Sequence, residues 1–244
     1  MEFQSMWPVV PLCKAQLEDV NPLDVLNGGL YRRCNTYKGG GGYDKFPEIW
    51  ERRFGKSGME LNNQFVVQVQ GCPLHCPYCY VTEAGVRGQH KCVSSLELIK
   101  DFRESGCGVF HLMGGAPALY LNKWPDLLRC LDGDVFHSDF LGLEGEYDIG
   151  VLREIAQYKN ALYAISIKGY TSEEFEKNTA TKFNSELFKR NMEKLLESGV
   201  SVYFTFTGMT TESIQQFKDE HKDWPFEDSF GINLVHYKAL DWKG

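Results

Sequence analysis

Short apolar runs alternate with amphipathic stretches from about residue 63 onward. Runs rich in β-branched and aromatic residues predict strands at 64–70, 109–113, 135–140, 163–167, 201–206 and 231–236. Apolar residues at helical spacing predict intervening helices at 94–104, 125–130, 151–157, 185–198 and 211–221. Strands that alternate with helices form βα units, so the pattern predicts a parallel sheet with right-handed crossovers.

Six such units predict an α/β fold, a partial (β/α)6 TIM-like barrel spanning residues 63–244. The expected helix ends agree with this assignment. Ser94 and Glu97 stand in capping-box positions, and Gly199 directly follows the amphipathic helix 185–198. Because chemistry in barrels gathers at the C-terminal ends of the strands, functional residues are expected directly after each strand.

Residues 1–62 lack this rhythm. They contain several prolines and four consecutive glycines at 39–42, and their apolar residues do not recur at regular spacing. Proline and glycine interrupt helices and strands. We therefore expect an irregular N-terminal extension with one helix near 46–54, which caps or flanks the barrel domain.

Composition narrows the class of protein. The 244 residues are 43% hydrophobic and 24% charged, which is ordinary for a chain with a packed core. A net charge of −7 argues against a nucleic-acid partner held by phosphate contacts. The chain has neither a membrane-length apolar run nor a secretory signal, so we expect a cytoplasmic protein. In a reducing compartment, its eight cysteines are expected as thiols or metal ligands.

Three of these cysteines form a compact motif. The segment 71–80, GCPLHCPYCY, places Cys72, Cys76 and Cys79 in a C-x3-C-x2-C spacing immediately after the first predicted strand. Each thiolate can bind one iron of a [4Fe–4S] cluster, which leaves the fourth iron open to another ligand.

A zinc site is the alternative interpretation of this motif. Structural zinc sites close with four ligands, and His75 or Cys92 is a candidate for the fourth. The remaining cysteines are scattered and are expected to be plain thiols: Cys13, Cys34, Cys92, Cys107 and Cys130.

With Tyr78 just before its last cysteine, the motif resembles that of the radical S-adenosylmethionine (SAM) superfamily. The segment QGCPLHCPYC resembles the corresponding segment of the glycyl-radical-enzyme activating enzymes, the pyruvate formate-lyase activase-like group. The resemblance covers residues 63–238 and implies two cofactors, a [4Fe–4S] cluster on the three cysteines and SAM on the open iron.

The resemblance also implies a set of SAM contacts at the strand ends: Tyr78, Gly114, Gly115, Ala116, Ser138, Asp139, Ser166, Lys168 and His236. Ala116 stands where the family has an acidic residue, so backbone carbonyls or another acid must hold the SAM ammonium. A lysine at a barrel mouth is costly unless an anion such as a carboxylate pairs with it, and an exposed surface lysine is the alternative for Lys168. A structural histidine is the alternative for His236, and a polar strand end without a ligand is the alternative for residues 137–140.

The function implied is reductive cleavage of SAM to a 5′-deoxyadenosyl radical that abstracts a hydrogen atom from a substrate. The resemblance also implies an electron donor such as flavodoxin or ferredoxin, and sensitivity to oxygen. The substrate is either a glycyl-radical protein or a small metabolite or peptide. A non-catalytic iron–sulfur or zinc module is the alternative from another class, and no residue is assigned a catalytic role beyond cofactor binding.

Overall fold

The computed structural model describes residues 5–10, 23–27, 30–34, 45–56, 63–79, 87 and 90–232. Among the helices in these ranges, none is both long enough and apolar enough to cross a membrane.

The fold is built on an eight-stranded sheet with the order β10-β9-β8-β7-β6-β4-β3-β2. Six consecutive strands of this sheet are parallel to one another: β4 (Asn63–Gln68), β6 (Val109–Met113), β7 (Val135–Phe140), β8 (Ala161–Ile167), β9 (Val202–Thr207) and β10 (Ser229–Ile232). Each new strand adds beside the previous one, as right-handed βα units require. The predicted α/β fold with a six-stranded parallel sheet is confirmed.

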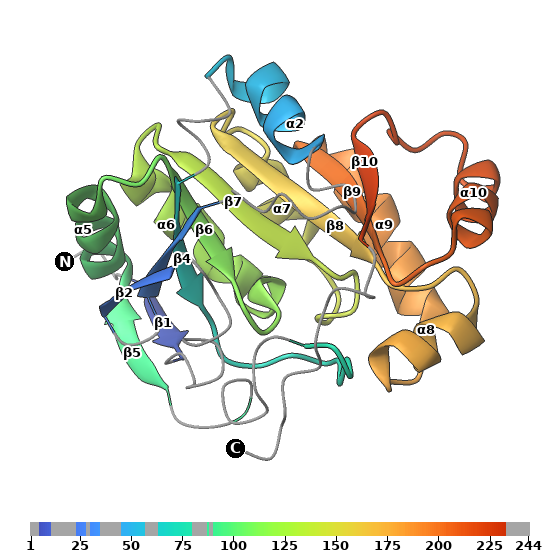
Figure 1. Ribbon diagram of the computed structural model, residues 1–244. Helices are drawn as coiled ribbons and strands as arrows, with labels where there is room; N and C mark the ends of the chain where they lie inside the picture. The colour runs from blue at the N-terminus through green and yellow to red at the C-terminus, as the bar shows by residue number, and fades with distance from the viewer. Residues whose placement is uncertain are drawn as a thin grey trace.

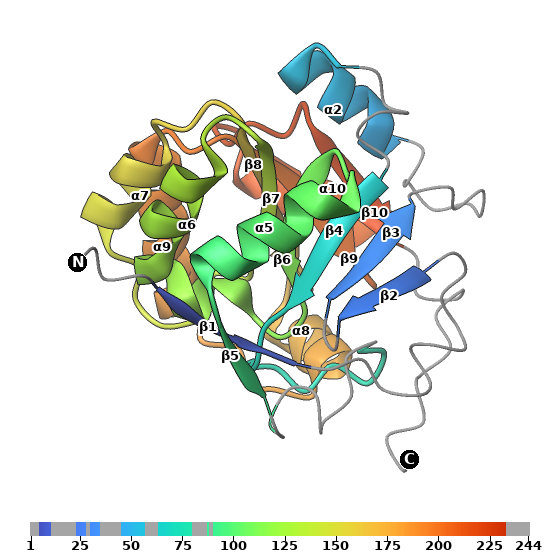
Figure 2. The ribbon, with the colours of Figure 1, turned by 90° about the vertical axis from the view of Figure 1, so that its left-hand side faces the viewer.

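Helices cover one face of this sheet, as Figures 1 and 2 show for α5, α6, α7 and α9. The helices after β4 are α5 (Ser95–Ser105), η1 (Pro117–Lys123), α6 (Trp124–Leu131), α7 (Ile149–Ile155), α8 (Ser172–Thr179), α9 (Ser185–Ser198) and α10 (Thr211–Glu220). The expected caps form, because Ser94 accepts a hydrogen bond from Glu97 N at 3.2 Å and Gly199 ends α9 in a left-handed conformation. Large aromatic side chains fill the helix-covered core, among them Phe65, Phe110, Phe136 and Phe204.

The N-terminal segment is not irregular where the structure describes it. Strands β2 (Leu23–Asn27) and β3 (Leu30–Cys34) extend the main sheet antiparallel to β4, and β1 (Met6–Val9) pairs with β5 (Lys91–Ser94). The prediction of an irregular extension is wrong for these strands, because β2 and β3 belong to the main sheet and β1 forms a two-stranded sheet with β5. Their hydrogen-bond partners lie far away in the sequence, so no local periodicity reveals them.

Helix α2 (Lys45–Phe54) matches the helix predicted near 46–54. It lies at the end of the sheet where the parallel strands begin (Figure 1). Ile49 and Trp50 are buried there against the first residues of several strands and against Tyr203. In the next turn of the helix, Arg52 and Arg53 both pair with Asp228, just before β10. Helix α2 therefore covers the barrel interior at its N-terminal end.

Candidate active site

The cysteine loop, residues 71–79, follows β4 at the opposite, C-terminal edge of the sheet. Cys76 is buried and Cys72 and Cys79 are half-buried, and none of the three forms a disulfide. The backbone shapes the loop, since Cys79 N–H donates to the Cys76 carbonyl at 3.0 Å. Leu74 N–H donates to Cys72 Sγ at 3.4 Å, an interaction that favours the thiolate.

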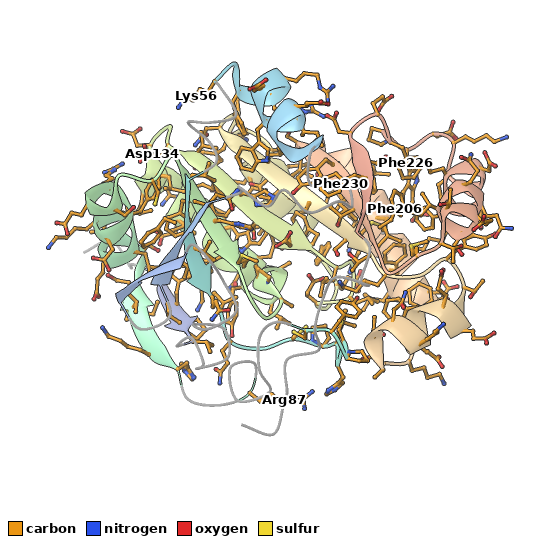
Figure 3. The ribbon with its side chains drawn as sticks, in the orientation of Figure 1. Lys56, Arg87, Asp134, Phe206, Phe226 and Phe230 are labelled. Atoms are coloured by element: carbon orange, nitrogen blue, oxygen red, sulfur yellow. The ribbon has the colours of Figure 1, made fainter. Side chains whose placement is uncertain are left out.

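The end of α8 holds the cysteine loop in place. His75 N–H donates to the Thr179 carbonyl at 3.0 Å, and Leu74 and Cys76 pack against Phe175 of α8. The His75 ring faces Arg87, whose Nη2 lies 2.8 Å from Nδ1 (Figure 3 shows Arg87 at this edge). The ring of His75 is therefore engaged with a cation, which disfavours it as a fourth zinc ligand.

The arrangement of the thiols fits a cluster better than a single ion. Burial raises the pKa of the Cys72 thiol to about 12, so a positive metal centre is needed to hold it as thiolate. Among the described residues, Cys72, Cys76 and Cys79 do not form a group whose ligand atoms all lie within 4.8 Å of one another. A single zinc ion needs such a group, whereas a [4Fe–4S] cluster binds each sulfur through a different iron.

The glycine turn after β6 lies directly against the start of the cysteine loop. Gly115 has φ +56°, and a Cβ there would overlap the carbonyl oxygens of Val69 and Gly71. Ala116 N–H then donates to the Gly71 carbonyl at 2.7 Å. Gly114 shares the left-handed backbone, with φ +70°. Glycine is required at both positions because the turn is left-handed and its backbone is closely packed.

Ala116 is fully buried in this turn, and its carbonyl accepts a hydrogen bond from Leu119 N at 3.1 Å. Its methyl group adds no charge to this edge of the sheet. Contacts of Gly114, Gly115 and Ala116 with SAM stay predictions.

Lys168 extends from the end of β8 to the cysteine loop. Its Nζ lies 3.5 Å from the Tyr78 hydroxyl and 5.5 Å from the centre of the Tyr78 ring. Burial lowers the pKa of Lys168, whereas negative charge on Tyr78 or on Cys76 raises it, and the net direction of the shift is upward. Burial raises the pKa of Tyr78 to about 12, so its hydroxyl stays protonated. The structure thus brings Tyr78 and Lys168, both predicted from the sequence, to one place.

The polar residues of β7 divide between the two faces of the sheet. His137 and Asp139 share the inner face, and by the same alternation Ser166 of β8 lies on that face. Ser138 points to the helix-covered face, where its hydroxyl donates to the Leu112 carbonyl at 2.8 Å. The Ser138 side chain thus lies away from the inner face, and the contact of Ser138 with SAM stays a prediction. His236 lies outside the described residues.

Two supporting residues were not predicted from the sequence. Asn178 of α8 donates to the carbonyls of Lys168 at 2.8 Å and Gly208 at 3.1 Å, which ties together the ends of β8 and β9. Buried Glu144 accepts hydrogen bonds from Leu141 N at 2.8 Å, Leu143 N at 2.9 Å and the Tyr147 hydroxyl. Burial raises the pKa of Glu144 and the hydrogen bonds lower it, and the net direction is upward.

Glu144 shapes a loop that packs against the site, because Leu141 and Leu143 contact the cluster of Leu74 and Cys76. The local sequence LGLEGEYD gives no sign of this role, since acidic loop residues are usually solvated. Only the fold places this carboxylate among buried donors.

Comparison with known proteins agrees with this geometry. Residues 66–223 match the model of the Radical SAM superfamily, which is more than half of the chain, and the chain belongs to this superfamily. No curated protein matches the sequence.

Solved structures with the same fold include native anSMEcpe with bound AdoMet, at 18% identity and a TM-score of 0.53. That match covers 70% of this chain and 49% of the other. Streptococcus suis SuiB bound to S-adenosylmethionine matches at 14% identity with a TM-score of 0.51, over 70% of this chain and 41% of the other. The chain thus spans less than half the length of these proteins, and the likeness confirms the partial TIM-like barrel.

Membership of the superfamily settles the cofactors and the general class. SAM and a [4Fe–4S] cluster are the cofactors of the family, and the domain implies a SAM-dependent enzyme. The residues at the C-terminal edge fit these cofactors, because three thiols stand beside a glycine turn and a charged lysine.

Proposed function

We propose that this chain holds a [4Fe–4S] cluster through Cys72, Cys76 and Cys79 and cleaves SAM reductively to generate a radical that abstracts hydrogen from a substrate. When bound by these cysteines, the cluster would supply the electron for the reductive cleavage of SAM. The observation that carries the proposal is the approach of Lys168 to Tyr78 in the cysteine loop, with Nζ 3.5 Å from the hydroxyl.

The residues of the chain bind and orient SAM in this proposal. The Lys168 ammonium is half-buried and charged, so an anionic group such as the SAM carboxylate would stabilise it. Gly114 and Gly115 allow the backbone to approach the methionine moiety closely. Helix α2 excludes water from the far end of the barrel interior, which protects a reactive radical.

Anaerobic reconstitution tests the proposal. The protein is loaded with iron and sulfide, reduced with dithionite in the presence of SAM, and assayed for 5′-deoxyadenosine by mass spectrometry. We expect about four irons per chain and formation of 5′-deoxyadenosine. The Cys76→Ala variant should lose both, whereas Cys92→Ala, at an exposed position, should keep both. Equal product from wild type and Cys76→Ala would overturn the proposal.

For the substrate, the resemblance of residues 70–79 to activating enzymes supports a glycyl-radical protein as the target. A peptide is the second candidate, because the structures with the same fold include anSMEcpe with the Cp18Cys peptide and SuiB with precursor peptide SuiA. Flavodoxin or ferredoxin is the proposed electron donor.

Deuterium transfer separates the two substrates. A candidate glycyl-radical protein from the same organism is labelled with α-deuterated glycine and mixed with the reduced enzyme and SAM. Deuterium in 5′-deoxyadenosine, together with a glycyl-radical signal in electron paramagnetic resonance, would support activation. Unlabelled product with that protein, and labelled product with deuterated peptides, would support the peptide candidate.

A further inference from the structure

A second group of potential metal ligands lies inside the barrel, apart from the cysteines. It consists of His111 on β6 with His137 and Asp139 on β7, and one ligand atom from each lies within 4.8 Å of the others. His111 and His137 are directly opposite in the register of the two strands, and Asp139 follows on the same face. The two imidazole rings are 4.2 Å apart, and His111 Nε2 lies 3.8 Å from Asp139 Oδ2.

We propose that His111, His137 and Asp139 bind a divalent transition-metal ion inside the barrel. Two imidazoles and one carboxylate are a common ligand set for Zn²⁺, Fe²⁺ or Co²⁺. Metal–ligand bonds of about 2.1 Å place neighbouring ligand atoms about 3 to 3.5 Å apart, so small side-chain rotations would close the site. The ligands stand on two adjacent strands, which are among the most rigid supports a fold offers.

Neighbouring polar groups orient both imidazoles. Gln64 Oε1 lies 2.8 Å from His111 Nδ1, so this nitrogen donates to the amide oxygen and Nε2 faces Asp139 as an acceptor. The Tyr203 hydroxyl lies 2.8 Å from His137 Nε2, which leaves Nδ1 as the candidate ligand of that ring. Metal-binding histidines typically use their second nitrogen in this way, and the contact fixes the tautomer.

Two aromatic rings pack against His137. The Trp50 ring packs edge-on against His137 at 5.2 Å, and Tyr203 stacks on the same ring at 5.8 Å. His111 is nearly inaccessible, with 5% of its side chain exposed, whereas 29% of the Asp139 side chain is exposed. A bound ion would therefore have three protein ligands below it and open positions toward the C-terminal ends of the strands. An oxygen or nitrogen donor of a small ligand would occupy those positions.

Zinc binding to the reconstituted holoenzyme tests the site, because the cluster then occupies the cysteines. Equilibrium dialysis against Zn²⁺ measures affinity and stoichiometry, and X-ray absorption at the zinc edge identifies the ligands. We expect one equivalent bound through nitrogen and oxygen at about 2.0–2.1 Å, without the sulfur shell near 2.3 Å that cysteine would give. Sulfur ligation, or less than half an equivalent bound, would overturn the proposal.

Variants connect that zinc to the named residues. His111→Gln and Asp139→Asn should each weaken Zn²⁺ binding at least tenfold, whereas His90→Gln, at an exposed position, should not change it. Should either ligand variant fail to fold, Tyr203→Phe keeps the ring and removes only the orienting hydroxyl. It should weaken binding about tenfold. Unchanged affinity in Tyr203→Phe and in every ligand variant that folds would show a structural hydrogen-bond network instead.

The two sites are separable in these assays. Iron content and 5′-deoxyadenosine formation report on Cys72, Cys76 and Cys79, while zinc stoichiometry reports on the histidines. A holoenzyme that binds zinc in the barrel but does not cleave SAM would support the metal site and contradict only the proposed function. Loss of SAM binding in Asp139→Asn with unchanged zinc affinity would assign Asp139 to SAM and overturn its role as a metal ligand.

Discussion

At the residue scale, a single buried carboxylate shapes the loop that covers the cysteines. We expect Glu144→Ala to lower the free energy of unfolding by about 3 kcal/mol. The change would leave two backbone N–H donors and the Tyr147 hydroxyl without their hydrogen-bond acceptor. Glu146→Ala, two residues away, removes an exposed partner of Lys194 and should have a much smaller effect. Urea unfolding followed by circular dichroism measures both, and equal effects would contradict this role for Glu144.

The charge of Lys168 can be tested separately from its bulk. Lys168→Met keeps an unbranched side chain but removes the ammonium, so we expect the Kd for SAM to rise about tenfold, or about 1.4 kcal/mol. Equilibrium dialysis with the cluster-loaded protein measures this Kd. The exposed Lys177→Met serves as the matched control. An unchanged Kd in Lys168→Met, with normal iron content, would remove Lys168 from the SAM site.

At the element scale, the turn after β6 depends on close packing as well as on backbone conformation. We expect Gly115→Ala to destabilise the protein by more than about 2 kcal/mol and to reduce iron retention, because its Cβ would overlap two carbonyl oxygens at the start of the cysteine loop. Gly133→Ala is a matched control, since φ is +93° there but no atom lies within 4 Å of an added Cβ. It should cost only about 1 kcal/mol. Thermal unfolding and iron analysis of both variants decide between packing and backbone strain.

The same scale shows why sequence reasoning found the barrel and missed other elements. Parallel strands and amphipathic helices are local patterns, so five of the predicted strands and the intervening helices appear close to their expected ranges. Strand β1 contains Pro8 and is defined by pairing with β5, more than 80 residues away, so local composition argued against it. Strand β7 is buried on both faces. The alternation of side chains along the strand therefore did not predict which face Ser138 occupies.

In the candidate site, too, residues in contiguous motifs were predicted, and residues that only the fold brings together were not. The C-x3-C-x2-C spacing and the glycine turn are contiguous motifs, so the sequence placed each directly after its strand, and the structure shows that they are neighbours. His111 lies in no recognisable sequence motif, because its proximity to His137 depends on the register of two neighbouring strands. Asn178 and Glu144 act through backbone groups that the fold delivers, which sequence patterns do not encode.

At the scale of the whole molecule, β2 and β3 extend the main sheet, and α2 packs on the core at the N-terminal ends of the parallel strands. Removal of residues 1–62 would expose the edge of β4 and the surface covered by Ile49 and Trp50. We expect the truncated chain to aggregate or to lose its cooperative thermal transition, as judged by gel filtration and calorimetry. A monomeric fragment with the transition of the full chain would instead support a separable capping domain.

The pairing of Arg53 with Asp228 has a consequence for biosynthesis. These residues are 175 positions apart, so on a ribosome α2 emerges long before its partner. At a synthesis rate of about 5–20 residues per second, the interval is about 9 to 35 seconds. During that time Ile49 and Trp50 lack the later strands against which they finally pack. We therefore expect this apolar surface of the nascent chain to stay exposed until the later strands have been synthesised.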